Sequence, residues 1–191
     1  MSDLTITTAG VTESKVSGGE FLSSDKKLNQ MKVNYVDVSI TLDANAYTVG
    51  DTMFIPTKVE NAMAVKGGSG ILQSATAIIQ NNSTVGSATG SDIGSFDIFI
   101  TSSKVTTNFA AANAAISGGT QTTAVANSIC GFTHITNMTD IGRQAVGCVN
   151  NIGMVVQADS DARDLYVFGV ANSANDYDSG ILVLRLGFVT D

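Results

Sequence analysis

Apolar and polar residues alternate between Lys32 and Leu42, and this is the clearest pattern in the chain. Side chains at alternate positions of an extended segment point to opposite faces, so a period of two predicts a strand with one buried face. The segment from Ser95 to Ser102 repeats the pattern, and we expect a second half-buried strand there. The apolar positions are Val36, Val38, Ile40 and Leu42 in the first segment and Phe96, Ile98 and Ile100 in the second.

The closing segment, from Ile181 to Phe188, begins with apolar residues on both of its faces. A strand in the middle of a sheet can bury both faces, whereas a loose apolar tail would stay exposed. We therefore predict a central strand. The segment from Leu165 to Asn172 is mostly apolar as well, and it predicts a strand buried on both faces. Because the connection between these two strands is short, we expect them to pair antiparallel.

Further strands are predicted for 71–80, 128–135 and 145–158, which are bounded or broken by Gly and Asn residues typical of turns. A short strand at 52–55 is expected either to end at Pro56 or to lie at a sheet edge, because proline lacks a backbone donor. These segments give about ten short strands, which favours an all-β fold.

The alanine-rich segment Asn108–Ser117, followed by Gly118 and Gly119, is the best helical candidate. With one short helix at most, the pattern predicts an antiparallel β-sandwich or a jelly-roll-like barrel. Residues 31–191 are expected to form this single domain. Residues 1–30 have few large apolar side chains and contain Gly18 and Gly19, so they predict an extended N-terminal arm or irregular lead-in. Such an arm either grips a neighbouring subunit or is an unstructured terminus.

Composition narrows the class of function. Hydrophobic residues make up 43% of the chain and charged residues only 14%, which suits β-sheets and a surface that lies against neighbours. A Ser- and Thr-rich soluble β protein is the alternative interpretation. The net charge of −7 argues against partners such as nucleic acid or an anionic membrane. No segment reaches the apolar length of a membrane span, and no secretory signal is expected at the N-terminus.

Residues able to carry chemistry are few. His134 is the single histidine, and no G-x-S-x-G motif lies beside it, so a structural or surface role is expected. Cys130 and Cys148 predict ordinary thiols, and a bridge between them is geometrically possible but unsupported. Together with His134 they match no common zinc spacing. We predict no catalytic, cofactor-binding or metal-binding residue.

The acidic segment 159–164 invites a calcium interpretation because Asp159, Asp161 and Asp164 lie close together. An EF-hand loop needs glycine at its sixth position and glutamate at its twelfth, where this chain has Asp164 and Ala171. We therefore expect a solvated turn between strands.

From about residue 33 to its end, the chain resembles tailed-bacteriophage capsid decoration (cement) proteins. The resemblance lies in the order of its segments: "ITLDANAYTVGD", "VKGGSGILQSATAI", "FDIFIT", "TNFAAANAAIS", "ICGFTHI" and "DLYVFGVANSANDYDSGILVLRLGFVTD". It does not extend to the first thirty residues. The resemblance implies a β-sandwich that binds the outside of a capsid, commonly as a trimer over a junction of major capsid protein subunits. It brings no catalytic residues.

The first functional hypothesis is therefore a non-enzymatic virion protein, made in the host cytoplasm, that binds the capsid outer surface and stabilises it. It implies the major capsid protein as partner and a homo-oligomer, with a trimer favoured. The alternative is a tail-associated or lectin-like β-sandwich that binds host surface glycans, for which Tyr47 and Tyr177 are the visible candidates. A hydrolase is the third hypothesis, and only His134 supports it.

Overall fold

The computed structural model describes residues 7–8, 11–12, 32–80, 94–105, 112–115, 127–136, 138–141, 144–174 and 180–190. It divides the chain into two compact units, Met1–Met31 and Lys32–Asp191. In the first unit, β1 (Thr7–Thr8) and β2 (Val11–Thr12) pair antiparallel. The arm predicted for residues 1–30 otherwise lies outside the described residues, so it stays a prediction.

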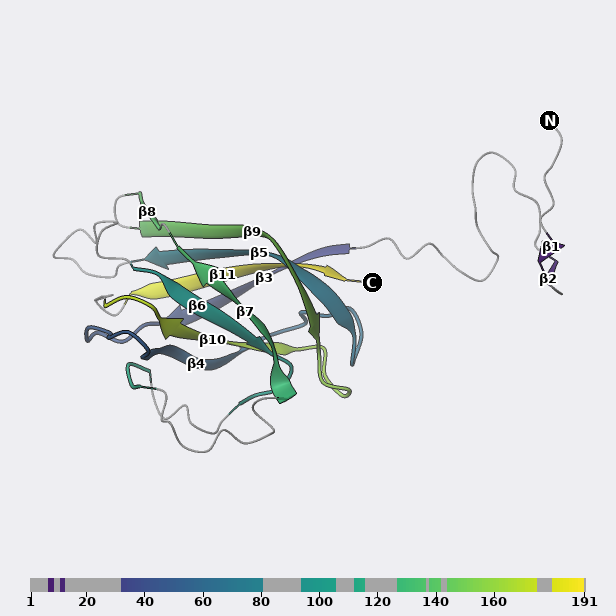
Figure 1. Cartoon of the computed structure of the whole chain (residues 1–191), viewed down its shortest axis with the longest axis horizontal. Coiled ribbons are helices and arrows are strands. Elements are labelled where there is room, and N and C mark those ends of the chain that lie inside the picture. Colours follow the sequence, from purple (N-terminus) through teal and green to yellow (C-terminus); the bar gives the residue numbers. More distant parts are fainter. Residues whose placement is uncertain are drawn as a thin grey trace. The chain divides into compact units, whose positions relative to one another are not determined.

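One antiparallel sheet of the second unit has five strands in the order β3-β11-β5-β9-β8 (Figure 1). The closing strand β11 lies between β3 and β5, with Leu184 opposite Val38 on one side and Ala77 on the other. The central position predicted for this strand is confirmed. The bounds are β3 (Lys32–Thr41), β11 (Ile181–Thr190), β5 (Ser69–Gln80), β9 (Gln144–Gln157) and β8 (Thr139–Asp140).

The other sheet has four antiparallel strands in the order β4-β10-β6-β7. Strand β10 is flanked by β4 and β6, which agrees with its mostly buried side chains. The bounds are β4 (Thr52–Val59), β10 (Leu165–Ala171), β6 (Phe96–Thr101) and β7 (Ile129–Ile135).

The strand order is that of a jelly roll. Strands β3, β5, β9 and β11 lie in one sheet while β4, β6, β7 and β10 lie in the other, so the chain passes between the sheets at most connections. Two four-stranded antiparallel sheets connected in this way form the double-sheet jelly roll, and the two-residue β8 only extends one edge. The all-β sandwich predicted from the sequence is confirmed.

The core fills the space between the two sheets. The inward residues of the closing strand, Leu182, Leu184, Leu186 and Phe188, are all fully buried. Those of β6, Phe96, Ile98 and Ile100, are fully buried as well. In β6 the period-two pattern identified the buried face, since alternate side chains of a strand lie on opposite sides of its sheet. In β11 apolar residues on both faces led us to expect both to be buried, but only one face lies in the core, and Arg185 on the other is 51% exposed.

The predicted pairing of the segment 165–172 with the closing strand is wrong. Strand β10 pairs with β4 and β6, whereas β11 pairs with β3 and β5 in the other sheet. The short connection carries the chain across the sandwich and does not form a hairpin. Chain proximity favours adjacent pairing, but two mostly apolar strands can both be central if each lies in its own sheet.

The structure also tests the predictions for Pro56 and for the helical candidate 108–117. Strand β4 does not end at Pro56, because it runs on to Val59, but it lies at the edge of its sheet as the other expectation allowed. In the helical candidate 108–117, the described residues 112–115 form a turn and a bridge from Ala115 to Asp51, so they are not helical. The rest of that segment lies outside the described residues. No helix in the described part of the chain is long and apolar enough to cross a membrane.

Candidate functional site

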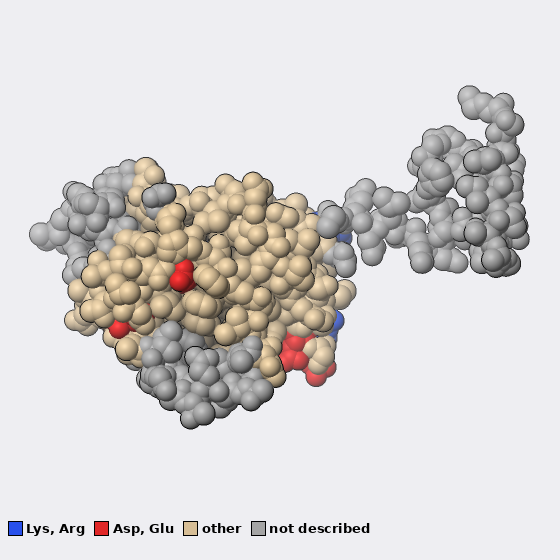
Figure 2. Space-filling model, in the orientation of Figure 1, with Lys and Arg blue, Asp and Glu red and all other residues tan. Residues whose placement is uncertain are grey.

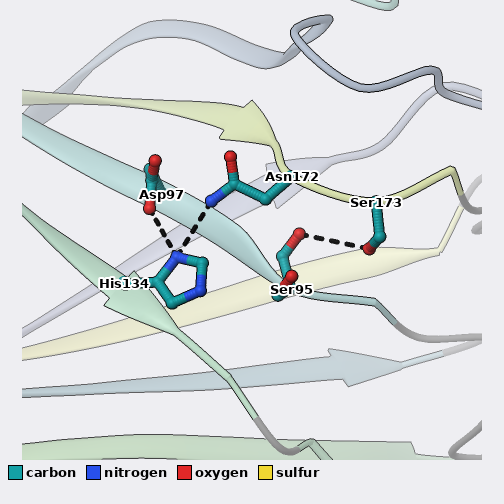
Figure 3. Close-up of polar contacts among 5 residues, drawn as sticks. All are labelled: Ser95, Asp97, His134, Asn172 and Ser173. Atoms are coloured by element: carbon teal, nitrogen blue, oxygen red, sulfur yellow. Dashed lines mark hydrogen bonds and ion pairs between the residues drawn. The ribbon is translucent and has the colours of Figure 1, made fainter.

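The single histidine forms a polar cluster on the outer side of the four-stranded sheet (Figure 3). His134 on β7 lies opposite Asp97 on β6, and its Nδ1 is 2.6 Å from Asp97 Oδ1. The side-chain nitrogen of Asn172, just after β10, is 2.9 Å from the same Nδ1. The backbone N–H of Asn172 donates to the carbonyl oxygen of Ser95, which places this residue beside the ring. The cluster therefore ties three neighbouring strands together.

Two contacts with opposite demands meet at Nδ1 of His134. The Asp97 carboxylate accepts a hydrogen bond from a protonated Nδ1, whereas the Asn172 amide nitrogen donates to an unprotonated one. In a Ser-His-Asp mechanism, Nε2 would face the nucleophile. Within the described residues, no hydroxyl or thiol is hydrogen-bonded to that nitrogen, and the His134 side chain is 43% exposed on the sheet surface. The arrangement therefore orients a histidine on the surface of the sheet.

Both cysteines are free thiols and lie on different sheets. Cys130 on β7 is partly buried and lies 3.9 Å from the carbonyl oxygens of Ser128 and Gln157. Cys148 on β9 is exposed, and its Sγ accepts a hydrogen bond from Thr76 Oγ1 at 3.3 Å. Among the residues that the structure describes, no group of three His, Cys, Asp or Glu side chains is placed to hold a metal ion.

The acidic segment 159–164 is a connection between β9 and β10, as predicted. Its last carboxylate, Asp164, accepts a hydrogen bond from the backbone N–H of Asn61 at 2.8 Å and lies 2.8 Å from Lys58 Nζ. The hydrogen bond from Lys58, followed by that from Asn61, lowers the pKa of Asp164. Through the hydrogen bond from Asn61, Asp164 links the connection between β9 and β10 to the connection between β4 and β5, which is a structural role.

Tyr47 does not lie on the surface, although the glycan hypothesis needs it there. Its side chain is fully buried, and its hydroxyl accepts a hydrogen bond from the N–H of Asp43 at 2.8 Å. The hydroxyl also donates to the carbonyl oxygen of Met53 at 3.1 Å. Burial is the main cause that raises the pKa of Tyr47. Tyr177, the other glycan candidate, lies outside the described residues.

The most unusual surface is the outer side of the five-stranded sheet. The inward residues of β11 alternate with Val183, Arg185, Gly187 and Val189, which point away from the core. Register extends each of these positions into a row across neighbouring strands. We call these four rows the outer sheet face. The rows are Ser39, Val183, Ile78 and Val146; Asp37, Arg185, Thr76 and Cys148; Tyr35, Gly187, Ser74 and Asn150; and Val33, Val189, Ile71 and Val155.

Two of these rows are mainly aliphatic. The row that begins at Ser39 continues with aliphatic side chains on three strands, and the row from Val33 to Val155 is aliphatic on all four strands. Val33 and Val155 are 61% and 69% exposed, and Tyr35 in the adjacent row is 65% exposed. We call these rows the two aliphatic stripes. An antiparallel sheet with one free face normally places polar residues there, so the stripes are typical of a face that something covers.

Charge is nearly absent from the outer sheet face. Arg185 and Asp37 are its only ionised side chains, and they neutralise each other through hydrogen bonds of 2.8 Å from Nε and Nη2. This hydrogen bonding lowers the pKa of Asp37. Figure 2 likewise shows few charged side chains on the part of the molecule that it displays, with acidic ones gathered mostly in one small patch.

The outer side of the four-stranded sheet carries a row of three aromatic rings. Phe99 stacks on Phe168 at a centroid distance of 4.8 Å and on Phe132 at 5.3 Å. Phe132 on the edge strand β7 is 58% exposed, so the row ends at the surface.

Near β4, at the opposite edge of the four-stranded sheet, an open hollow of about 370 Å³ lies between β3 and β4. It is lined mainly by hydroxyl and aliphatic side chains and contains no titratable group.

The outer sheet face was not predicted from the sequence. Its signal was present, because Ile181 and Val183 were recognised as apolar residues on the second face of the closing strand. That pattern was interpreted only as evidence for a central strand. The stripes appear when four strands far apart in the sequence are aligned, and the register of those strands comes from the fold.

Comparison with protein-family models and with curated protein sequences gives no match to this chain. Among solved structures, a chain described as Desmodium yellow mottle tymovirus aligns with it at 11% sequence identity and a TM-score of 0.27. The alignment covers 97% of this chain and 95% of that chain. At this TM-score the similarity carries no argument about fold or function.

Proposed function

We propose that this chain is a non-enzymatic structural protein of a virion, a decoration (cement) protein that binds the outer surface of a capsid. The observation that carries the proposal is the outer sheet face, with its two aliphatic stripes and a single neutralised ion pair. Contiguous apolar surface of this kind is rare on proteins that act alone and common where proteins associate. The order of segments resembles that of decoration proteins, and this resemblance is the reason for proposing a capsid as the assembly.

The jelly roll is compatible with this role but does not select it, because virion proteins, lectins and cupins share the architecture. The placement of side chains helps to distinguish between these classes of protein. The space between the sheets is filled chiefly by apolar residues, and the one histidine of the chain lies on the outside at His134. The glycan alternative loses one of its two candidate residues because Tyr47 is buried. Association through an uncharged face is the function that these placements favour.

A decoration protein stabilises a shell by linkage. It binds the assembled lattice and not the separated capsid subunits, so each bound copy shifts the equilibrium toward the assembled state. In the proposed role, the partner is the major capsid protein and the chain acts as a homo-oligomer on the outside of the virion. No step of bond making or breaking is required of any side chain.

The test is cosedimentation of the purified full-length chain with capsids of its source virus that lack this protein. We expect saturable binding and a higher temperature of capsid disruption after binding. Capsids that already carry the protein are the matched control and should bind no more of it. Absence of binding at saturating protein would overturn the proposal, and specific hits on a glycan array would then favour the alternative.

A further inference from the structure

We infer that the outer sheet face is covered by the same face of a second copy of this chain. The inference rests on the proposed function and specifies its association step: the outer sheet face joins two copies, and the pair binds the capsid through other surfaces. It concerns Val33, Val155 and Val183 in the two aliphatic stripes, and the two polar rows between them, one of which contains both Arg185 and Cys148.

The order of the rows makes the face complementary to itself. Two polar rows lie between the two aliphatic stripes, so the sequence of rows is aliphatic, polar, polar, aliphatic. A two-fold axis that lies in the plane of the contact turns the face over onto itself. Whether this axis runs along the strands or across them, aliphatic rows meet aliphatic rows and polar rows meet polar rows. A two-fold contact of this isologous kind joins identical patches.

Charge favours the same partner. The chain has a net charge of −7, so two copies repel one another over most approaches. The outer sheet face has no net charge, because Asp37 and Arg185 neutralise each other, and the other described Asp and Glu residues lie outside its rows. Two anionic copies can therefore meet through this face at low electrostatic cost. Lysine, which is costly to desolvate and depleted at interfaces, is absent from its rows.

The size of the face lies near the lower limit for a specific pair. Four strands about 4.8 Å apart, over six residues at about 3.4 Å each, give a patch of roughly 500 Å² with its marginal side chains. Two copies would bury roughly 1,000 Å² in total, which reaches the lower limit of specific interfaces. Sheets pack face to face at a separation of about 10 Å, and the short Val, Ile, Ser and Thr side chains of these rows fit that separation.

This contact is closed by two copies, so the mass expected in solution is that of a dimer, in place of the trimer that the resemblance implied. Cys148 reports on the contact directly, because its exposed thiol lies in one of the polar rows. In a Cys130→Ser variant it is the only thiol of the chain. The test measures its rate of maleimide labelling across a protein dilution series, together with the mass from light scattering.

We expect a dimer whose Cys148 is labelled about tenfold more slowly than after dilution, since labelling must wait for the unpaired fraction. Val155→Lys places a charge in an aliphatic stripe and should give a monomer with fast labelling at all concentrations. Val49→Lys is the matched control, because Val49 is equally exposed at 69% but lies in the connection between β3 and β4. It should leave both the mass and the labelling rate unchanged.

Labelling of Cys148 that does not change with concentration would overturn the inference, whether the mass is that of a monomer or of an oligomer formed elsewhere. Adding capsids separates this inference from the proposed function. If Cys148 becomes protected only when capsids are present, the shell covers the face, so the inference fails while the proposed function stands. If copies pair but no capsid binding occurs, the inference stands and the proposed function fails.

Discussion

Arg185 on β11 and Asp37 on β3 lie opposite each other in register and share two hydrogen bonds of 2.8 Å, from Nε to Oδ1 and from Nη2 to Oδ2. The side chains are 51% and 46% exposed, so solvent screens much of the attraction. In the Val155→Lys background, expected to be monomeric, Asp37→Asn should therefore lower Tm by less than about 3 °C, as measured by circular dichroism.

The same pair tests the register of β3 against β11. Asp37→Arg alone places two like charges opposite each other, which destabilises a cross-strand pair. Adding Arg185→Asp restores opposite charges in exchanged positions, so the double variant should melt at a higher temperature than Asp37→Arg. A double variant that melts no higher than the single variant would contradict the register.

Tyr47 and Tyr35 offer a matched comparison, because one is fully buried and the other is 65% exposed. Tyr47→Phe removes a hydroxyl that accepts a hydrogen bond from Asp43 N and donates one to Met53 O. We expect the free energy of unfolding to fall by about 1–3 kcal/mol in urea denaturation. Tyr35→Phe should change it by less than about 0.5 kcal/mol. Equal effects would show that the Tyr47 hydroxyl contributes nothing in the core.

Gly169 on β10 leaves room for the buried ring of Phe54 on β4. A Cβ atom at this position would lie 2.8 Å from Phe54 Cδ1, closer than carbon atoms normally approach. Gly169→Ala is expected to destabilise the domain by about 1–3 kcal/mol, because the ring must leave its position. Phe54→Leu in the same chain should recover part of this loss, and a double-mutant cycle from urea denaturation measures the coupling. Strictly additive effects would contradict the contact.

Asp164 links stability to acid pH. Its pKa is lowered in the folded state, first by the hydrogen bond from Lys58 and then by that from Asn61. A carboxyl whose folded pKa is depressed contributes stability above its unfolded pKa of about 3.9 and loses it as pH falls toward the folded value. Asp164→Ala should thus cost about 1 kcal/mol at neutral pH, after allowance for its partial exposure, and progressively less below about pH 4. Urea denaturation at pH 7 and pH 3 measures both values, and an equal loss at the two would contradict the linkage.

The sequence by itself determined where most of the strands lie and, where apolar and polar residues alternate, which side of the strand is buried. Alternation at 36–42 and 96–100 places every second side chain on one face whatever the partner strand, so it needs no knowledge of tertiary structure. The single histidine also restricted which catalytic mechanisms the sequence could support. A jelly-roll-like fold was among the two predicted architectures, because many short strands with Gly and Asn turns are compatible with few all-β folds.

Only the tertiary structure decided which strands are neighbours. Strand pairing depends on contacts between distant segments, so the short connection before β11 suggested a hairpin where the chain in fact changes sheets. The same dependence hid the outer sheet face: Val33, Ile71, Val155 and Val189 are scattered in the sequence and form one aliphatic row through register alone. It also placed Tyr47 in the core, where its ring is covered and its hydroxyl is satisfied by backbone groups. A local pattern fixes the direction of a side chain, but the global fold decides what that side chain meets.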